Sequence, residues 1–315
     1  MISLPGHSTG IVASVGRTCC TEATVRQAIL AGAMNYRLPL GLRDRDLCAD
    51  FRTLRDASSI LDQGIRVLVD LPASRPRVGV VEDRAFGEGE RTRFVDAAAV
   101  AAPAVPVPGL RRFLPRVHVG ERIVFRDGRL QFRVVSVGDN FLEAECIACA
   151  GPLHACHGCA FPDSDLAFDA LLPEDKATLA AFAAADLCPD WVMVSFAANA
   201  VHLADVRLEL NALWPNTAIR VMAKVETQAA VENLAELLDA ADGLLIGRGD
   251  LGISYPIERV PKVQEYVATA ARDAGKPFTV ATQFFESFAL RGELSRAEVS
   301  DVALAVRQGA AGIVL

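Results

Sequence analysis

Aromatic side chains and clusters of basic residues are scarce in this chain of 315 residues. Aromatics make up 6% of the sequence, and 32 Lys and Arg stand against 39 Asp and Glu, so the formal net charge is −7. Because no basic run is interleaved with aromatic residues, we expect no nucleic-acid partner. No apolar stretch is long enough to cross a bilayer, and the N-terminus does not show the regions of a signal peptide. We therefore expect a soluble, cytoplasmic protein without a membrane partner; the sequence leaves a homo-oligomer open.

Cysteine occurs eight times, and four of the eight are crowded into residues 146–159. Because there is no secretory signal, we expect reduced thiols and not a disulfide framework. The two C-x2-C pairs have the spacing of a structural zinc site, but we expect this segment to form a β-hairpin that turns near Gly151. Alternate residues of a strand face opposite sides, so unliganded thiols are favoured over zinc. The ligands of the alternative zinc site are Cys146, Cys149, Cys156 and Cys159.

Short β-branched runs alternate with longer amphipathic stretches in the outer parts of the chain. The runs are purely apolar in their centres, as parallel strands buried on both faces require. Eight such strands in strand–helix order predict an α/β fold, a closed (β/α)8 TIM barrel that lacks the last helix. We expect strands at about 10–15, 34–40, 65–70, 191–196, 219–226, 243–247, 277–282 and 312–315, and helices at about 24–30, 43–61, 173–184, 202–213, 228–239, 261–274 and 296–308.

The alternation stops between residues 73 and 163. Residues 97–109 are rich in Ala, Pro and Val, which favours irregular or extended chain. The segment that follows alternates apolar and polar residues with a period of two, broken by Asp-Gly turns, and this is typical of β-sheet. The sequence therefore predicts a barrel domain from 1–72 and 164–315, with a small β domain from 73–163 inserted after the third strand.

Polar residues follow the expected strands at one end, where the active site of a βα-barrel is found. Lys224 and Glu226 are two residues apart in one strand, so their side chains point the same way, and Asp250 follows the neighbouring strand. Two carboxylates with room for water suit Mg²⁺ or Mn²⁺, and a lysine suits charge that develops on an oxygen or a phosphoryl group. A plain Lys–Glu salt bridge at the barrel mouth is the alternative. The strand-end set is Arg37, Asp70, Ser195, Lys224, Glu226, Arg248, Asp250 and Thr282.

The segments that carry these residues resemble pyruvate kinase. DWVMVSF, VMAKVET, DGLLIGRGDLGI, PIERVPKVQ, GKPFTVATQFFES and SRAEVSDVALAV occur in that family's order and spacing. GIVASVG, AGAMNYRL and VLVDLP resemble it more loosely, and GERIVFRDG and HGCAFP resemble its mobile lid domain. The resemblance implies a barrel with an inserted lid domain. The family's eighth helix and C-terminal domain have no counterpart in this sequence, so we expect a chain without them.

The resemblance also implies roles for individual residues. Lys224 would stabilise the transferring phosphoryl group and the enolate, while Glu226 and Asp250 would hold the divalent metal. Thr282 would lie on the face where the enol is protonated. On the substrate side, the backbone at Gly249 and Asp250 would meet the carboxylate. The remaining substrate contacts would be Arg37 and Arg77 at the phosphate and Ser195 in the pocket wall.

This sequence departs from the family's pattern at two places. Pro39 and Gly41 replace the Asn and Ser that help to bind a monovalent cation, although Asp70 of that region remains. Arg75 stands where the family has Glu or, in potassium-independent members, Lys, so a fixed cation could substitute and we expect no K⁺ requirement. At the lid edge, His157 replaces the nucleotide-contacting Lys, so the binding of ADP or ATP is in doubt.

Three functions follow from this comparison. The first is a divergent pyruvate kinase that transfers a phosphoryl group between phosphoenolpyruvate and ADP with Mg²⁺ or Mn²⁺, giving pyruvate and ATP. The second is a nucleotide-independent, metal-dependent lyase or decarboxylase that acts through a pyruvate enolate, which fits the altered nucleotide side. The third is a non-catalytic relative. The first is favoured because the enolate half of the site is intact.

Overall fold

The computed structural model describes residues 9–16, 19–42, 44–164, 166 and 168–315. The chain divides into two compact units. The first comprises Met1–Ala73, Asp169–Leu251 and Glu258–Leu315, and the second comprises Ser74–Phe168 with Gly252–Ile257. The predicted domain assignment, 73–163 against the remainder, stays a proposal. Among the described helices, none has the length and apolar character needed to span a bilayer.

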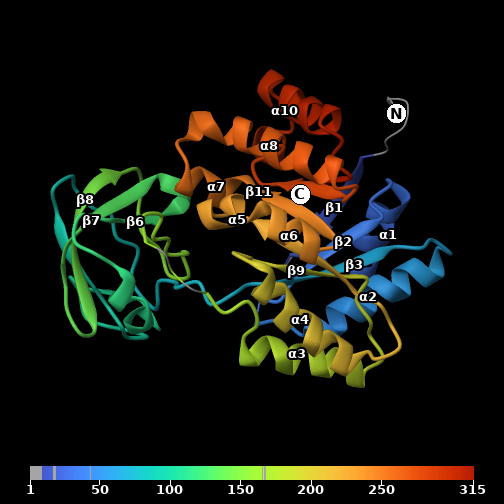
Figure 1. The fold of residues 1–315 in the computed structure, drawn as a ribbon, viewed down its shortest axis with the longest axis horizontal. Helices are drawn as coiled ribbons and strands as arrows, with labels where there is room; N and C mark the ends of the chain where they lie inside the picture. The colour runs from blue at the N-terminus through green and yellow to red at the C-terminus, as the bar shows by residue number, and fades with distance from the viewer. Residues whose placement is uncertain (1–8, 17–18, 43, 165, 167) are drawn as a thin grey trace. The chain divides into compact units, whose positions relative to one another are not determined.

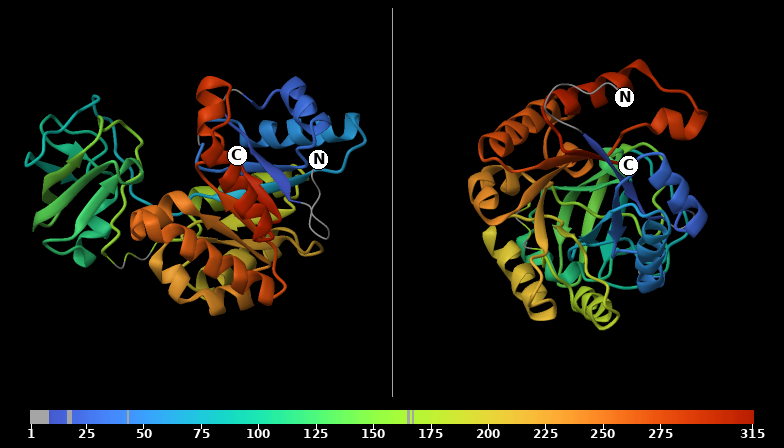
Figure 2. Two further views of the ribbon diagram at one scale, coloured as in Figure 1. Left: turned by 90° about the horizontal axis from the view of Figure 1, so that it is seen from above. Right: turned by 90° about the vertical axis from the view of Figure 1, so that its right-hand side faces the viewer.

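Eight parallel strands close the barrel of the first unit, in the spatial order β1-β13-β12-β11-β10-β9-β3-β2 (Figure 1). The predicted (β/α)8 barrel is thereby confirmed, and helices surround the strands on the outside (Figure 2). The strands are β1 (Gly10–Ser14), β2 (Asn35–Pro39), β3 (Arg66–Leu71), β9 (Trp191–Val194), β10 (Arg220–Val225), β11 (Gly243–Gly247), β12 (Phe278–Ala281) and β13 (Gly312–Val314).

The helices begin and end at local signals that periodicity alone does not reveal. The helix predicted from residue 43 begins at Leu47, because the Asp46 side chain accepts a hydrogen bond from the Ala49 N–H and caps it there. The helix predicted over 228–239 is broken at Asn233. The helices are α1 (Glu22–Leu30), α2 (Leu47–Ile60), α3 (Pro173–Ala184), α4 (Ala200–Leu213), α5 (Gln228–Glu232), α6 (Leu234–Ala240), α7 (Arg248–Ser254), α8 (Val260–Asp273), α9 (Glu286–Arg291) and α10 (Arg296–Arg307).

The second unit is built on a five-stranded sheet in the order β5-β4-β8-β7-β6, as the predicted small β domain requires. Its strands are β4 (Arg91–Val95), β5 (Val105–Pro106), β6 (Arg122–Phe125), β7 (Leu130–Val137) and β8 (Phe141–Cys149). The prediction of a hairpin that turns near Gly151 is wrong. The hairpin joins β7 to β8 before residue 141, and β8 ends at Cys149.

Apolar side chains fill the interior of the barrel in a layer across its middle. Leu68, Met193 and Met222 belong to this cluster and come from the neighbouring strands β3, β9 and β10. Side chains two residues further along a strand point to the same side. The barrel interior therefore receives Asp70 from β3 and Lys224 from β10 at the carboxyl ends of the strands.

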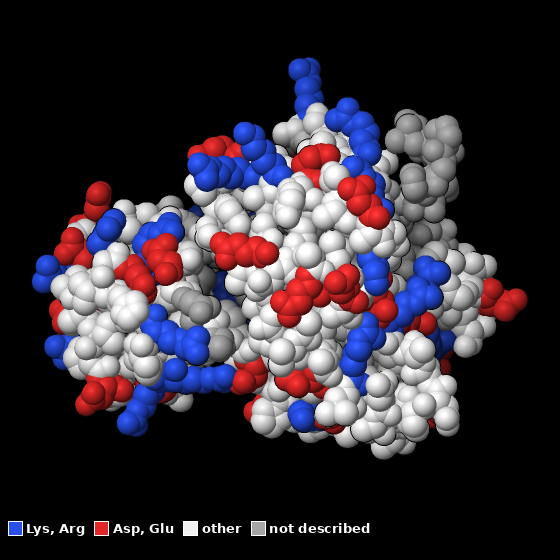
Figure 3. Space-filling view, in the orientation of Figure 1, with Lys and Arg blue, Asp and Glu red and all other residues white. Residues whose placement is uncertain are grey.

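Charged side chains of both signs are interspersed on the face of the molecule that Figure 3 shows. Mixed charges cancel over a distance of about a Debye length, roughly 8–10 Å at physiological salt. Charge–charge interactions are therefore stronger in the pockets, where less water lies between the charged groups.

The aromatic core of the second unit predicts a large effect of one substitution. Phe132 is fully buried, and its ring meets those of Phe86, Phe94 and Phe125 edge to face. Phe132→Ala should lower the stability of this unit by about 3–5 kcal/mol, because a cavity remains where the ring was. Hydrogen exchange of β7 and β8 measures the change. Val119→Ala, at a side chain 66% exposed, is the control, and equal effects of the two variants would contradict the assignment of this core.

Candidate active site

A buried lysine lies at the centre of a polar cluster at the carboxyl ends of the barrel strands. The Nζ atom of Lys224 donates to Ser195 Oγ at 2.7 Å. The same atom lies 3.1 Å from Glu226 Oε1 and 3.3 Å from Asp70 Oδ1. Lys224 is 8% exposed, and the two acids are 5% and 4% exposed. The structure thus brings together four of the residues that the strand-end pattern selected.

Arg37 supplies a second cation on the other side of Asp70. Its Nη2 and Nε atoms lie 2.6 Å and 2.8 Å from Asp70 Oδ2, and Nη1 donates to Ser14 Oγ at 3.2 Å. A guanidinium that makes two contacts with one carboxylate is held in a fixed orientation. Arg37 therefore presents a positioned positive charge beside Lys224.

Asp70 and Lys224 keep each other ionised in spite of their burial. Burial alone would raise the pKa of Asp70, but the positive charges of Lys224 and Arg37 outweigh it, so the pKa of this carboxyl is lowered. Burial alone would lower the pKa of Lys224, but Asp70 and Glu226 raise it. The site consequently keeps a lysine ammonium ion at neutral pH.

Glu226 is placed against the backbone of two neighbouring elements. Its Oε2 atom accepts a hydrogen bond from the Phe196 N–H at 3.0 Å. Burial raises the pKa of Glu226, and the charge of Asp250 raises it further, although Lys224 opposes both. A Cβ atom on Gly247 would lie 2.6 Å from Glu226 Cγ, so only glycine leaves room for this carboxylate. Glu226 and Asp250 are the two acids of this pocket that could hold a divalent cation.

Thr282 is held in an unusual backbone conformation by Arg248. Thr282, Gln283 and Phe285 all have positive φ angles, of 74°, 59° and 60°. Arg248 donates to the carbonyl oxygens of Ala281 at 3.3 Å and Thr282 at 2.5 Å. Non-glycine residues in this region are strained, and surrounding contacts must fix them. The arginine thus fixes the loop that carries Thr282.

Arg248 is itself anchored on two sides. Its Nη1 atom lies 2.5 Å from Asp301 Oδ1, and its guanidinium carbon lies 4.1 Å from the centre of the Phe284 ring. The sequence placed Arg248 among the strand-end polar residues without giving it a role. Its role in fixing the Thr282 loop was missed because positive φ angles at non-glycine residues leave no sequence signal.

The Thr282 hydroxyl connects this loop to the start of α7. Its Oγ1 atom accepts from the Gly249 N–H at 2.8 Å and donates to the Ala281 carbonyl at 2.6 Å. Ala281 and Thr282 line a cavity of about 270 Å³, close to the lower end of the volumes of small-molecule sites, roughly 300 Å³. Its wall is formed by Ser14, Arg37, Lys224, Glu226, Leu245, Gly247, Asp250, Ala281, Thr282, Gln283, Phe284, Val314 and Leu315.

Arg75 and Arg77 belong to the second unit, unlike the residues of this cavity. Arg75 donates to the carbonyl of Cys159 at 3.4 Å, and Arg77 donates to the carbonyl of Cys156 at 3.2 Å. The expected roles of Arg75 at a cation site and of Arg77 at a phosphate stay predictions. Arg37 and Lys224 both contact Asp70.

The four cysteines of the expected zinc alternative do not form a metal-binding cluster. All eight cysteines are free; Cys146 and Cys159 are buried, whereas Cys149 and Cys156 are exposed. Within the described ranges, no three His, Cys, Asp or Glu side chains come together as metal ligands. Burial raises the pKa of Cys159, which works against the thiolate that zinc needs. The structure therefore gives the zinc alternative no support.

The sequence and the fold of this chain are similar to those of known proteins. The family model described as pyruvate kinase, barrel domain, matches residues 6–315. A pyruvate kinase of Agrobacterium vitis is 32% identical over 97% of this chain and 64% of its own length. One of Thermococcus litoralis is 30% identical over 100% of this chain and 66% of its own length. The crystal structure of a pyruvate kinase from Cryptosporidium parvum matches with a TM-score of 0.87 and 21% identity, over 98% of this chain and 64% of that one. The chain thus spans just under two thirds of these relatives.

The close approach of Gly247 to Glu226 predicts that even a methyl group is not tolerated there. Gly247→Ala should lower the free energy of unfolding by about 1–3 kcal/mol, because the new Cβ atom would displace a buried carboxylate. Urea denaturation measures this quantity. Gly64→Ala is the control, since a Cβ atom there meets nothing within 4 Å. If both substitutions proved neutral, the packing of Glu226 against β11 would be incorrect.

Proposed function

Because this chain belongs to the pyruvate kinase family, we propose that it is a divergent pyruvate kinase-like phosphotransferase. The proposed reaction is Mg²⁺-dependent phosphoryl transfer between phosphoenolpyruvate and ADP, which gives pyruvate and ATP. The observation that carries this proposal is the buried, charged Lys224, which lines one cavity with Glu226 and Asp250. A fixed ammonium beside two acids suits a reaction in which negative charge develops on a phosphoryl group and an enolate oxygen.

Glu226 and Asp250 fit a divalent cation. Burial raises the pKa of Glu226, and the neighbouring charge of Asp250 raises it further; a bound cation would favour the ionised form of both acids. Their oxygen atoms are the donors that Mg²⁺ and Mn²⁺ prefer, and Mg²⁺ retains several waters when a protein offers few ligands. When bound, the ion would polarise substrate oxygens.

The remaining side chains of the cavity would bind and orient the substrate. Lys224 and Arg37 present two positive charges, which suit the phosphate of phosphoenolpyruvate. We propose that Ser195, through its hydrogen bond with the ammonium, fixes the direction of Lys224. The backbone at Gly249 and Asp250 would meet the substrate carboxylate. Thr282, held by Arg248, would lie on the face where the enol takes up its proton.

We further propose that the enzyme does not require K⁺. Pro39 and Gly41 cannot offer the side-chain oxygens that a monovalent cation needs, and Arg75 would supply a fixed positive charge in its place. Initial rates should be unchanged when K⁺ is replaced by tetramethylammonium. Arg75→Glu should lower the rate, and K⁺ should not restore it, because the ligands of a K⁺ site are still missing; Arg129→Glu, also in the second unit, should leave the rate unchanged. A K⁺ requirement in the unaltered protein would refute this part of the proposal.

A second candidate uses the same enolate half of the site without a nucleotide. It is a metal-dependent lyase or decarboxylase that acts on an oxyacid through a pyruvate enolate. The observation that favours it is His157, which stands where the family has a nucleotide-contacting Lys; its Nδ1 atom accepts a hydrogen bond from the backbone N–H of His154. Binding of ADP distinguishes this candidate from the first.

Titration calorimetry with oxalate, which imitates the pyruvate enolate, tests both candidates. Oxalate should bind in the presence of Mn²⁺ but not in its absence, because the metal would join it to Glu226 and Asp250. Glu226→Gln should abolish this binding, and Glu232→Gln, at an exposed position of α5, should leave it unchanged.

Addition of ADP to the oxalate complex then separates the candidates. Binding of ADP, followed by its phosphorylation by phosphoenolpyruvate, would establish the kinase. Metal-dependent release of pyruvate from oxaloacetate, unaffected by ADP, would establish the lyase. Absence of oxalate binding by folded protein would exclude both and leave a non-catalytic relative.

A further inference from the structure

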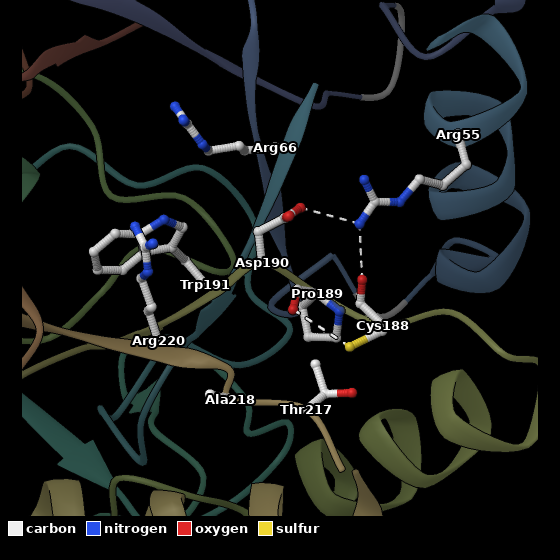
Figure 4. A pocket seen from close by; sticks show the side chains of 9 residues that line it. All are labelled: Arg55, Arg66, Cys188, Pro189, Asp190, Trp191, Thr217, Ala218 and Arg220. Atoms are coloured by element: carbon white, nitrogen blue, oxygen red, sulfur yellow. Dashed lines mark hydrogen bonds and ion pairs between the residues drawn. The ribbon is translucent and has the colours of Figure 1, made fainter. Parts of the chain in front are cut away.

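A second cavity lies at the amino ends of the barrel strands, away from the site described above. Its volume is about 350 Å³, within the range of small-molecule sites. It is formed where β3, β9 and β10 begin, and Figure 4 shows its side chains. The lining residues are Arg55, Arg66, Cys188, Pro189, Asp190, Trp191, Thr217, Ala218 and Arg220.

One arginine of this cavity is committed to the structure of the barrel. Arg55 lies 3.0 Å from Asp190 Oδ2 and donates to the Cys188 carbonyl at 2.8 Å. The same oxygen of Asp190 accepts from the Val67 N–H at 2.8 Å. Arg55 and Asp190 therefore neutralise each other and join α2 to β3 and β9.

Two further arginines of this cavity are not paired with an acid in the described part of the chain. Arg66 and Arg220 are the first residues of β3 and β10, and within the described part of the chain neither forms an ion pair with an acid. Arg220 lies over the ring of Trp191, with its guanidinium carbon 5.3 Å from the ring centre. Figure 4 shows Arg66, Trp191 and Arg220 on one side of Asp190 and Arg55 on the other.

Strand geometry directs both free arginines toward the barrel axis. Arg66 precedes Leu68 by two residues, and Arg220 precedes Met222 by two, so each pair shares a face. Leu68, Met222 and Trp191 belong to the same interior cluster. Both arginines thus lie at the amino end of the barrel interior, and Arg220 lies over the ring of Trp191.

The charge of the cavity indicates which ligand it would take. Three arginines stand against one aspartate, an excess of two positive charges, and burial raises the pKa of Cys188, so its thiol is neutral. Planar guanidinium groups bind phosphates and carboxylates through paired hydrogen bonds. We propose that this cavity is a second binding site, which takes a small doubly charged oxyanion between Arg66 and Arg220.

This inference is independent of the proposed function, because none of its residues lines the Lys224 cavity. Phosphate could also bind at Lys224, so the test needs a reporter in the second cavity. The chain has two tryptophans, Trp191 and Trp214. Trp214→Phe leaves Trp191 as the single fluorophore, and an anion that draws Arg220 from its ring should change its emission.

The experiment titrates the Trp214→Phe protein with inorganic phosphate and, in parallel, with malonate, at constant ionic strength set with NaCl. Saturable change in Trp191 emission is expected. In this background Arg66→Gln, which leaves the Arg220–Trp191 contact in place, should weaken binding by at least about tenfold, since it removes a charge-assisted hydrogen-bond donor. Arg296→Gln, an exposed arginine at the start of α10, is the matched control and should change nothing.

Comparison of the two titrants shows whether phosphate or dicarboxylate is preferred, and either result supports the site. Arg66 and Arg220 are both exposed, so their substitution should not unfold the protein, and circular dichroism of each variant checks this. Emission that responds equally in all variants, or that responds to NaCl alone, would overturn the proposal.

Discussion

The ion pair between Lys224 and Asp70 is the interaction on which the rest of the candidate site depends. Both groups are almost fully buried, and each keeps its charge mainly through the other, with Arg37 assisting Asp70 and Glu226 assisting Lys224. Breaking such a pair leaves an uncompensated charge and is costly, about 3–5 kcal/mol in buried pairs. Arg37 and Ser195 satisfy the hydrogen-bonding capacity that remains. Two positively charged side chains are thereby held in fixed positions at the carboxyl end of the barrel.

Two strands, β3 and β10, carry charged side chains at both ends of the barrel. In β3 the inward side chains run from Arg66 through Leu68 to Asp70, and β10 runs from Arg220 through Met222 to Lys224. Each strand is thus polar at its two ends and apolar in the middle. The apolar layer keeps the two charged regions apart, so the excess positive charge at the amino end does not compete for the acids at the carboxyl end.

Much of the fold and of the site could be predicted because both follow from short periodicities. The barrel follows from eight apolar runs, and the spacing of Lys224 and Glu226 puts both on one face of β10. The start of α2 and the break at Asn233 could not be predicted from the sequence. Hydrophobic periodicity does not show which polar side chain accepts a hydrogen bond from a backbone N–H at a helix end. The hairpin at Gly151 was wrong because glycine signals a turn without saying which strands it joins. The second cavity could not be predicted from the sequence, since Arg66, Trp191 and Arg220 line one cavity only when the barrel closes.

The clamp formed by Arg248 ties the position of the Thr282 hydroxyl to α10. Arg248 reaches Asp301 in that helix, and its other nitrogen atoms hold the backbone carbonyls of the loop. The positive φ angles of this loop are fixed by contacts with Arg248. Its geometry therefore depends on a helix that contributes no residue to the cavity wall. A substitution of Asp301 in α10 would therefore move the Thr282 hydroxyl while every residue of the cavity wall stayed the same.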